Sequence, residues 1–337
     1  MTFRTARLAF LVAVSMPALA SAGTLDTVKE RGRLTCGVNE GLAGFSAKSA
    51  DGKWVGFDVD FCRAIAAAVL GDSEKVDYVP LSTSSRFPAL REAKIDVLSR
   101  NSTWTMGREE EFGITFVGVT YYDGQGFMVP RAKSVDSSLE LGGRKVCVQA
   151  DTTSASNLAD YFVTNNMAYE VVVTASPDES LASYKEGRCD VLTSDISQLY
   201  SQRTALPDAS EHLILPDAIS KEPLGPAVRQ DDPAWAMLVR WVHFALVDAE
   251  ELGISSKTID DALTSKKPDV QRLVGTDGTF GEKLGLTKEW AAQMVRQVGN
   301  YGEIYERNLG TGSSFGIPRG LNQLWNLGGI QYAPPIR

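Results

Sequence analysis

The sequence predicts an α/β fold of two lobes joined by two hinge crossings. Three observations lead to this prediction. The length of 337 residues suits about two domains. Short strands alternate with helices, and one stretch of sequence is echoed 94 residues later. With 43% hydrophobic and 23% charged residues, the composition is that of an ordinary globular protein, which excludes disordered and collagen-like chains.

The N-terminal segment is expected to be absent from the folded protein. Arg4 and Arg7 precede the apolar run Leu8–Leu19, and Ala20-Ser21-Ala22 follows, as in a secretory signal peptide. The run is too short for a stable anchor across a hydrocarbon core of about 30 Å, and no Cys follows it to accept a lipid. We predict that residues 1–22 are cleaved and that the mature protein is free in the periplasm. An uncleaved anchor is the alternative.

The charge balance argues against nucleic acid as a partner. The whole chain carries a net charge of -8, and without Arg4 and Arg7 the remaining 32 basic residues face 42 acidic ones, a net charge of -10. A nucleic-acid-binding protein needs a basic excess to displace counterions. We therefore predict an acidic surface and no nucleic-acid partner. A monomer is also expected.

The first lobe is expected to begin with elements that alternate between helix and strand. Gly71 marks the stop of one helix, for which Asp58 or Asp60 is the expected cap. Strands and helices of this length imply βαβ units and a mostly parallel sheet. In order, the expected elements are a helix over Thr24–Arg31, strands over Arg33–Val38 and Trp54–Phe57, the capped helix, a strand over Val76–Pro80, a helix after Ser82–Ser85 and a strand over Ile95–Leu98.

An internal echo supports a second lobe of the same design. The stretch REAKIDVLSRN at residues 91–101 is answered by KEGRCDVLTSD at residues 185–195. Each copy reads as a helix end, a short Asp-Val-Leu strand and a polar residue five places after the Asp. Coincidence is the alternative, because helix-to-strand turns share turn chemistry. Around the second copy we expect a strand over Val146–Gln149 and helices over Ser154–Phe162, from Ser176, and over Ile196–Gln202.

Two passages marked by Gly or Pro flank the second lobe. Residues 122–126 lead into it and residues 221–226 lead out of it, so they are the expected hinge crossings. Lobe 1 then comprises residues 23–123 and 225–337, and lobe 2 comprises residues 124–224. The helical C-terminal extension is expected to pack mainly on lobe 1.

Four cysteines lie outside the signal segment and would meet an oxidising compartment. Three pairings are possible. We predict Cys36 with Cys62 and Cys147 with Cys189, since each pair falls within one unit. A metal site would need closely spaced ligands, whereas the two histidines lie far from every Cys. No metal or other cofactor is expected.

The binding site is expected where strands end. Ligands of open α/β sheets bind beyond the carboxyl ends of the strands, which selects Asn101–Thr103 from one lobe and Thr152, Thr153 and Asp195 from the other. Arg108 can hold a carboxylate with two parallel hydrogen bonds, and Asp195 supplies the opposite charge. An Arg and an Asp on different lobes are complementary to the two charges of a zwitterion, which would hold the lobes together by binding both.

Each of these residues also has a purely structural alternative. Arg108 precedes three glutamates and could form a surface ion pair with them. Asp195, Thr152 and Thr153 could cap the helices that follow them.

At these residues the sequence resembles the polar amino-acid group of periplasmic solute-binding proteins of ABC transporters, family 3, and most closely its general L-amino-acid-binding branch. The similarity covers nearly all of the mature chain. The motifs that carry it are Cys36-Gly37-Val38-Asn39, Gly44-Phe45-Ser46, Trp54-Val55-Gly56-Phe57-Asp58-Val59-Asp60, Ser99-Arg100-Asn101-Ser102-Thr103-Trp104-Thr105 with Arg108, Gln149-Ala150-Asp151-Thr152-Thr153, Thr193-Ser194-Asp195 and the stretch from Ser314 to Asn322.

The resemblance implies a type II periplasmic-binding-protein fold that closes on a free L-amino acid and presents it to an inner-membrane ABC permease. Arg108 would hold the α-carboxylate, helped by amides near Thr103 and Thr153. Asp195 would take the α-ammonium, with Asn101 near it. By the same resemblance, the side-chain pocket would draw on Asn39, Glu40, Leu42, Phe45 and the segment around Thr83. For Phe45, a place in the core or at the rim of the site is the alternative.

The chain departs from the family pattern at a few positions. Asn39 and Leu42 stand where binders of basic amino acids carry an acid and an aromatic residue, so strict selectivity for lysine or arginine is not expected. Asp151 stands where Gly is usual, and we expect it to point away or to cap the helix. Arg100 is expected in a salt bridge outside the pocket, the alternative being contact with an acidic ligand side chain.

The alternative function is a carboxylate-binding enzyme on the same scaffold, similar to a cyclohexadienyl dehydratase. Such an enzyme needs a general acid or base, and Glu40 is the uncommitted carboxylate near the site. A sensor subunit for a receptor kinase would differ only in its partner.

Overall fold

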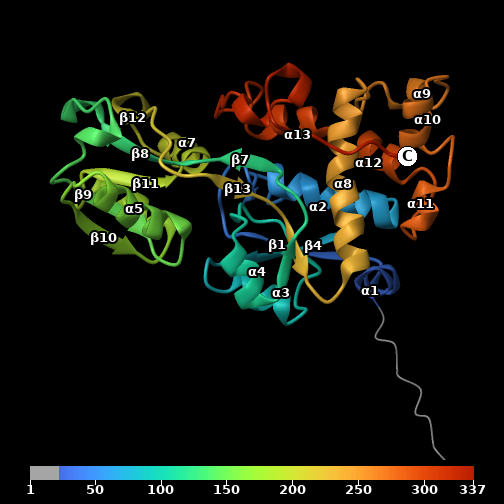
Figure 1. Cartoon of the computed structure of the whole chain (residues 1–337), viewed down its shortest axis with the longest axis horizontal. Helices are drawn as coiled ribbons and strands as arrows, with labels where there is room; N and C mark the ends of the chain where they lie inside the picture. The colour runs from blue at the N-terminus through green and yellow to red at the C-terminus, as the bar shows by residue number, and fades with distance from the viewer. Residues whose placement is uncertain (1–22) are drawn as a thin grey trace, which may run out of the picture.

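The computed structural model describes residues 23–337, so the predicted signal peptide over residues 1–22 lies outside the described residues. Two five-stranded sheets organise this part of the chain in two separate lobes (Figure 1). The first sheet has the order β4 (Val76–Leu81), β1 (Leu34–Asn39), β5 (Val97–Leu98), β14 (Ala227–Arg229), β6 (Ile114–Phe116). The second has the order β10 (Glu170–Thr174), β9 (Lys145–Gln149), β11 (Val191–Asp195), β8 (Gln125–Pro130), β12 (His212–Ile214).

The two sheets share one topology. β1 pairs in parallel with β4 and β5, just as β9 pairs in parallel with β10 and β11. β5 and β11 each have an antiparallel partner on the other side, β14 and β8 respectively. The echoed stretches therefore carry the equivalent central strands of the two sheets, and the predicted two-lobed α/β fold is confirmed.

Helices cover the first sheet, and a Gly residue rather than an acid precedes α2 (Phe57–Leu70), which follows the hairpin of β2 (Ala47–Lys48) and β3 (Trp54–Val55). Gly56 has φ 134°, and a Cβ there would lie 2.1 Å from the Phe45 carbonyl oxygen. The helix starts directly after this turn, so the predicted caps Asp58 and Asp60 were wrong and both lie in its first turn. The other elements here are α1 (Thr24–Arg31), α3 (Arg86–Arg91) and α4 (Met106–Phe112).

The second lobe is smaller and has its own core. Phe127, Leu158 and Phe162 are fully buried in it. Besides the sheet it contains η1 (Arg131–Lys133), η2 (Ser138–Glu140), α5 (Thr153–Thr164), α6 (Pro177–Lys185), α7 (Ile196–Thr204) and η3 (Ala209–Glu211).

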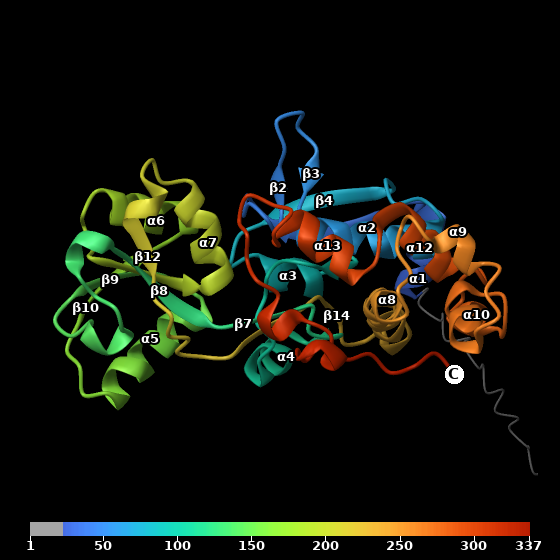
Figure 2. The ribbon, with the colours of Figure 1, turned by 90° about the horizontal axis from the view of Figure 1, so that it is seen from above.

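The C-terminal extension packs on the first lobe, as expected (Figure 2). Trp235, Trp290 and Tyr305 of the extension share one hydrophobic core with Phe57 and Phe61 of α2. Its elements are α8 (Pro233–Glu251), α9 (Ile259–Ala262), α10 (Pro268–Val274), α11 (Phe280–Lys283), α12 (Trp290–Val298), α13 (Tyr301–Asn308), η4 (Gly320–Asn322) and η5 (Trp325–Leu327). Among residues 23–337 no helix is long and apolar enough to cross a membrane.

Two crossing strands connect the lobes. β7 (Tyr121–Asp123) pairs antiparallel with β13 (Glu222–Leu224), so the chain enters and leaves lobe 2 along one ribbon. The extension holds this ribbon, because the Asn322 side chain accepts from the Tyr122 N–H at 2.7 Å and donates to its carbonyl at 3.0 Å. The lobe boundaries at residues 123/124 and 224/225 coincide with the ends of these strands and stay a prediction.

Each lobe carries one disulfide. Cys36 of β1 is bonded to Cys62 of α2, and Cys147 of β9 is bonded to Cys189 just before β11. Each bond therefore ties the strand beside the central one, β1 or β9, to an element of the same lobe.

Candidate functional site

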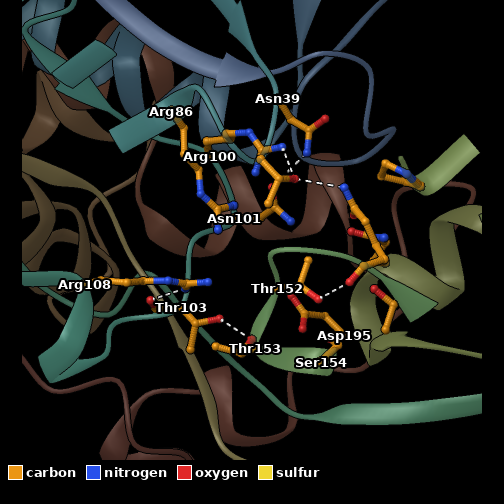
Figure 3. A pocket seen from close by; sticks show the side chains of 15 residues that line it. Asn39, Arg86, Arg100, Asn101, Thr103, Arg108, Thr152, Thr153, Ser154 and Asp195 are labelled. Carbon is orange, nitrogen blue, oxygen red and sulfur yellow. Dashed lines mark hydrogen bonds between the residues drawn. The ribbon is translucent and has the colours of Figure 1, made fainter. Parts of the chain in front are cut away.

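A polar cleft lies between the lobes at the carboxyl ends of the strands (Figure 3). Its lobe 1 wall contains Asn39, Thr83, Arg86, Arg100, Asn101, Thr103 and Arg108. Its lobe 2 wall contains Gln149, Thr152, Thr153, Ser154, Pro177, Ser194, Asp195 and Gln198. Eight of the predicted site residues are therefore brought together here, with charged groups on both walls.

Arg108 reaches the cleft from the first turns of α4. Thr105 caps this helix by accepting a hydrogen bond from the Arg108 N–H. The guanidinium donates to the Thr103 carbonyl at 2.6 Å and lies over the Phe87 ring, 5.4 Å from its centroid. Within the described chain it forms no ion pair with the three glutamates after it. One fixed hydrogen bond leaves further guanidinium N–H groups for a ligand.

Asp195 is the acidic group of the opposite wall. It ends β11 and stands at the N-cap position of α7. Its side chain makes no capping hydrogen bond within the described part of the chain. Burial, reinforced by Asp123 and Glu222, raises the pKa of Asp195 well above its ordinary value, against the opposing effect of Arg108 and Arg86. The site thus holds a carboxylate that a ligand cation would stabilise in its ionised form.

Glu222 fixes the two threonines of the cleft, a role that the sequence analysis missed. Its carboxylate oxygen Oε2 accepts from Thr103 Oγ1 at 2.6 Å and from Thr153 Oγ1 at 2.8 Å. Asn157 and Ser220 donate to Oε1 at 2.7 and 2.6 Å. The sequence analysis placed Glu222 only in the expected hinge crossing over residues 221–226. The one feature that could have identified it is that it is an acidic residue in this crossing. Glu222 therefore joins residues of both lobes at the floor of the hinge.

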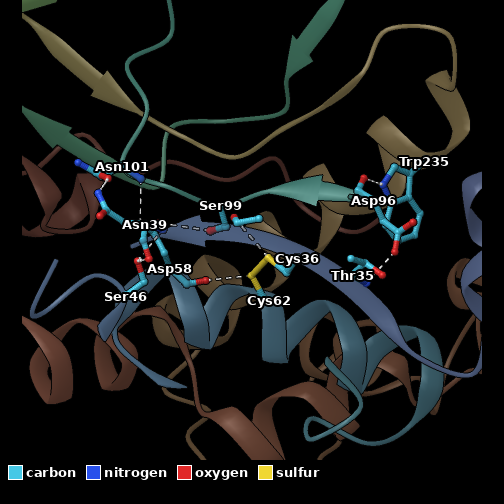
Figure 4. Close-up of a disulfide and its surroundings, with 11 residues drawn as sticks. Thr35, Cys36, Asn39, Ser46, Asp58, Cys62, Asp96, Ser99, Asn101 and Trp235 are labelled. Carbon is cyan, nitrogen blue, oxygen red and sulfur yellow. Dashed lines mark hydrogen bonds between the residues drawn. A yellow bond between two sulfur atoms is a disulfide. The ribbon is translucent and has the colours of Figure 1, made fainter. Parts of the chain in front are cut away.

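Asp58 positions the end of the central strand of lobe 1 (Figure 4). It is buried and accepts from the Asn101 N–H at 2.8 Å and from Ser99 Oγ at 3.2 Å. Burial raises the pKa of Asp58 to about 6. Asn39 donates to the Asn101 side-chain oxygen at 3.1 Å, so both amides are held at the edge of the cleft. Asp58 of the Gly56-Phe57-Asp58 motif thus holds the cleft residue Asn101 in place without lining the cleft itself.

An outer compartment adjoins the cleft. Glu40 and Leu42 line it, while Asn39, Thr83 and Arg100 line both spaces. Phe45, expected in the side-chain pocket, lies instead in the hydrophobic core at 1% exposure, with its ring centroid 5.6 Å from that of Tyr121. Its position next to the Gly56 turn directs it inward, so it lines neither space.

The segment after β9 explains one departure from the family pattern. Asp151 has φ 57°, a left-handed conformation that Gly adopts most readily and that Asp tolerates. Its side chain is exposed and is not among the groups that line the cleft. Thr152 donates to the Gln149 carbonyl at 2.7 Å, and among the described residues it makes no capping bond to α5.

Arg100 and Arg86 add positive charge to the lobe 1 wall. Arg100 donates to the Leu81 carbonyl at 2.8 Å and to Thr83 Oγ1 at 3.3 Å. It lines the cleft and belongs to no salt bridge in the described chain, so the expected salt bridge outside the pocket was wrong. Arg86 was missed because it opens a helix instead of following a strand. The feature that could have identified it is a positive charge in the first turn of a helix, a place where the helix dipole disfavours cations.

Neither histidine reaches the cleft. His243 is buried on α8, and burial lowers its pKa to about 4. His212 lies on β12 and its Nδ1 is 2.8 Å from the Tyr184 hydroxyl. Glu40 is exposed in the outer compartment. These positions supply no buried acid–base pair for the enzyme alternative.

The fold and the cleft define a two-lobed receptor for a small ligand with separate positive and negative groups. A family model described as bacterial extracellular solute-binding proteins, family 3, matches residues 34–257. The chain belongs to this family.

Known relatives match over almost their full length. The general L-amino acid-binding periplasmic protein AapJ of Rhizobium johnstonii is 56% identical over 94% of both chains. The glutamate/glutamine/aspartate/asparagine-binding protein BztA of Rhodobacter capsulatus is 49% identical over 98% of this chain and 99% of its own. Both are named as binding proteins and not as enzymes.

A solved structure extends the likeness to the whole fold. It is an ABC transporter periplasmic binding protein from Brucella ovis with glutathione bound, and it is 49% identical to this chain. The TM-score is 0.92 over 94% of this chain and 100% of that chain. The predicted family and fold class are confirmed.

Proposed function

We propose that the protein is the periplasmic receptor of an ABC importer for L-amino acids, exported by the signal peptide over residues 1–22. It binds the zwitterion between its lobes and hands it, as a monomer, to an inner-membrane permease. The names of the relatives support this ligand class and this compartment. Glutathione, bound in the Brucella ovis relative, carries the same α-amino-acid group at its glutamyl end.

The observation that carries the proposal is the placement of Arg108 and Asp195 on opposite walls of one buried cleft. Arg108 binds the α-carboxylate through charge-assisted hydrogen bonds, with the Thr103 and Thr153 segments beside it. Asp195 accepts from the α-ammonium, and Asn101 lies on the facing wall. No bond is made or broken in this function.

Closure follows from contacts that require both lobes. We take residues 23–123 with 225–337 as one moving body and residues 124–224 as the other. A ligand shifts the equilibrium toward the closed form only if it binds that form better. A zwitterion between Arg108 and Asp195 meets this condition. In the open form the ligand contacts only one wall, so one of its two charges lacks its partner residue.

The outer compartment receives the ligand side chain. Asn39, Glu40, Leu42 and Thr83 supply amide, carboxylate, aliphatic and hydroxyl groups on its wall. This mixed lining suits several amino acids.

Calorimetric titration of unfolded and refolded, ligand-free protein with a panel of L-amino acids tests the function. Wild type is expected to bind several of them, and Arg108→Ala and Asp195→Ala to weaken all of them. Arg91→Ala and Asp160→Ala, both exposed and outside the cleft, are the matched controls. Absence of binding by folded wild type, or wild-type affinity in both cleft variants, would overturn the proposal.

A further inference from the structure

We infer that Asn322 of the C-terminal extension is a positioning residue for lobe closure. It fixes the first hinge crossing, β7, to lobe 1, so that this crossing bends only at its lobe 2 end. The inference rests on the proposed function, since it concerns how the lobes close on a ligand, and it gives the extension a role in ligand affinity.

Asn322 occupies the edge of β7 that faces away from β13. In an antiparallel pair, residues alternate between those that bond to the partner strand and those that do not. The Tyr122 N–H donates to the Asn322 side-chain oxygen at 2.7 Å, and the Asn322 side-chain nitrogen donates to the Tyr122 carbonyl at 3.0 Å. The Asn322 side chain thus takes the place of a third strand beside the ribbon.

The other edge of the ribbon is also held by lobe 1. The Trp104 N–H donates to the Pro223 carbonyl at 2.8 Å, and Trp104 directly follows the cleft residue Thr103. The ribbon of β7 and β13, which runs between the lobes in Figure 1, therefore has a lobe 1 partner on each edge. Asn322 is the partner that comes from the extension.

Asn322 is itself firmly anchored. It is buried, and Arg319 donates from Nε to its backbone carbonyl at 3.0 Å. The Arg319 guanidinium also donates to both carboxylate oxygens of Glu250 on α8, at 3.1 and 3.2 Å. On α13, the Tyr301 hydroxyl donates to the Thr120 carbonyl at 2.8 Å. Helices α8 and α13 therefore anchor the lobe 1 end of the first crossing.

Beyond Tyr122 the contacts change from lobe 1 to lobe 2. The Asp123 carboxylate accepts from the Ser197 N–H at 3.3 Å, and the Gly124 carbonyl accepts from the Ile196 N–H at 2.8 Å. Both donors lie in the first turn of α7. A hinge bends at the few residues between two rigid bodies, so the bend of this crossing falls between Tyr122 and Gly124.

The position of this bend determines where Asp195 arrives on closure. Asp195 directly precedes α7, the helix that holds the lobe 2 end of the crossing. A single bending point moves Asp195 along one path toward Arg108 on the other wall. Without the Asn322 side chain, the crossing can bend on either side of Tyr122. More lobe arrangements then compete with the closed form, and ligand binding must order more backbone.

Asn322→Ala tests the inference by calorimetric titration of ligand-free protein with the panel of L-amino acids. Affinity is expected to fall about tenfold, the cost of ordering the backbone of one further residue on closure. The factor is expected to be the same for every amino acid that wild type binds, because Asn322 lines neither the cleft nor the outer compartment. Asn326→Ala, exposed in η5 of the same extension, is the control and is expected to bind like wild type.

Hydrogen exchange of the same variant separates positioning from a loss of stability. The Tyr122 amide is expected to exchange faster in Asn322→Ala, while α8 and α13 keep the protection of wild type. Faster exchange in these helices as well, together with wild-type affinity, would show a purely structural role and overturn the inference.

The titration also separates the inference from the proposed function. Wild-type affinity in Asn322→Ala, or a loss for some amino acids and not for others, overturns the role of Asn322 and leaves the receptor function standing. If folded wild type binds no amino acid, the proposed function fails, and the closure role fails with it.

A measurement on wild type covers the case in which Asn322→Ala does not fold. Because Asn322 and Tyr122 belong to one moving body, the Tyr122 amide is expected to exchange slowly both without and with ligand. Fast exchange of this amide in ligand-free protein that becomes slow after ligand addition would show that the bonds form only on closure, which contradicts the inference.

Discussion

Gln149 Nε2 of lobe 2 donates a hydrogen bond of 2.9 Å to Thr83 Oγ1 of lobe 1. The bond crosses the cleft between the binding site and the outer compartment, both of which these two residues line. Thr83 also accepts from Arg100, so a residue of each lobe converges on one hydroxyl. This contact exists only when the lobes are close together.

Replacement of Gln149 by Ala is therefore expected to destabilise the closed form. One neutral hydrogen bond contributes about 1 kcal/mol, so ligand affinity should fall about fivefold. Most of the loss should appear as faster dissociation, which stopped-flow fluorescence measures. Gln230→Ala, exposed and outside the cleft, is the control. Dissociation at the wild-type rate would show that the bond does not stabilise closure.

Ligand binding is expected to release a proton. Burial and nearby acids raise the pKa of Asp195 in the ligand-free protein, and a bound ammonium favours its ionised form. The carboxyl therefore loses its proton on binding, and affinity rises with pH until the pKa of the free site is passed. Titration in buffers of different ionisation enthalpy measures the released proton. Asp195→Asn should bind weakly and without this release; proton uptake by wild type would contradict the account.

The disulfide of lobe 2 is expected to stabilise it by restricting the unfolded chain. Cys147 and Cys189 are 42 residues apart. For a loop of this length the chain-entropy model gives about 4 kcal/mol. Urea unfolding of the double variant Cys147→Ser, Cys189→Ser should show a loss of this order, with the Cys36–Cys62 bond as the retained internal control. A loss below about 1 kcal/mol would show that the cross-link contributes little.

Asp248 on α8 is expected to make the protein less stable at alkaline pH. Burial, with Glu251 nearby, raises its pKa to about 7, and its Oδ2 is buried without a partner in the described chain. Because the folded pKa lies above the unfolded value of 3.8, the folded form takes up the proton first, and stability rises as the pH falls from 8 toward 4.

Asp248→Asn should remove this dependence. The free energy of unfolding is expected to increase on the order of 2 kcal/mol at pH 8 and less at pH 5. Thermal unfolding at the two pH values measures the difference between variant and wild type. An equal gain at both pH values would mean that the charge of Asp248 is not the cause.

Much of the site could be predicted because the relevant signal is local. Asn101 and Asp195 follow short apolar strands, and parallel strands bring such ends to one edge of a sheet. The echo between the two stretches placed them at equivalent positions, and the two sheets have the same order. Arg108 lies shortly after the first of these strands, but that place left a surface ion pair with the following glutamates open, and its role came from the resemblance to the family.

The rest depends on packing that no local pattern reveals. Phe45 is near the first strand, but the turn at Gly56 packs it against Phe57 and Tyr121 in the core. Arg86 enters the cleft because it is the first residue of α3, and this end of the helix lies at the cleft. Glu222 acts through hydroxyl groups from two distant segments, and their convergence exists only in the folded protein.

The most direct test of the central claim is a crystal structure of the protein with L-glutamate bound. The account predicts the α-carboxylate on Arg108 and the ammonium on Asp195, with the side chain toward the outer compartment and the lobes closed. A ligand outside this cleft, or one whose ammonium lies away from Asp195, would contradict it.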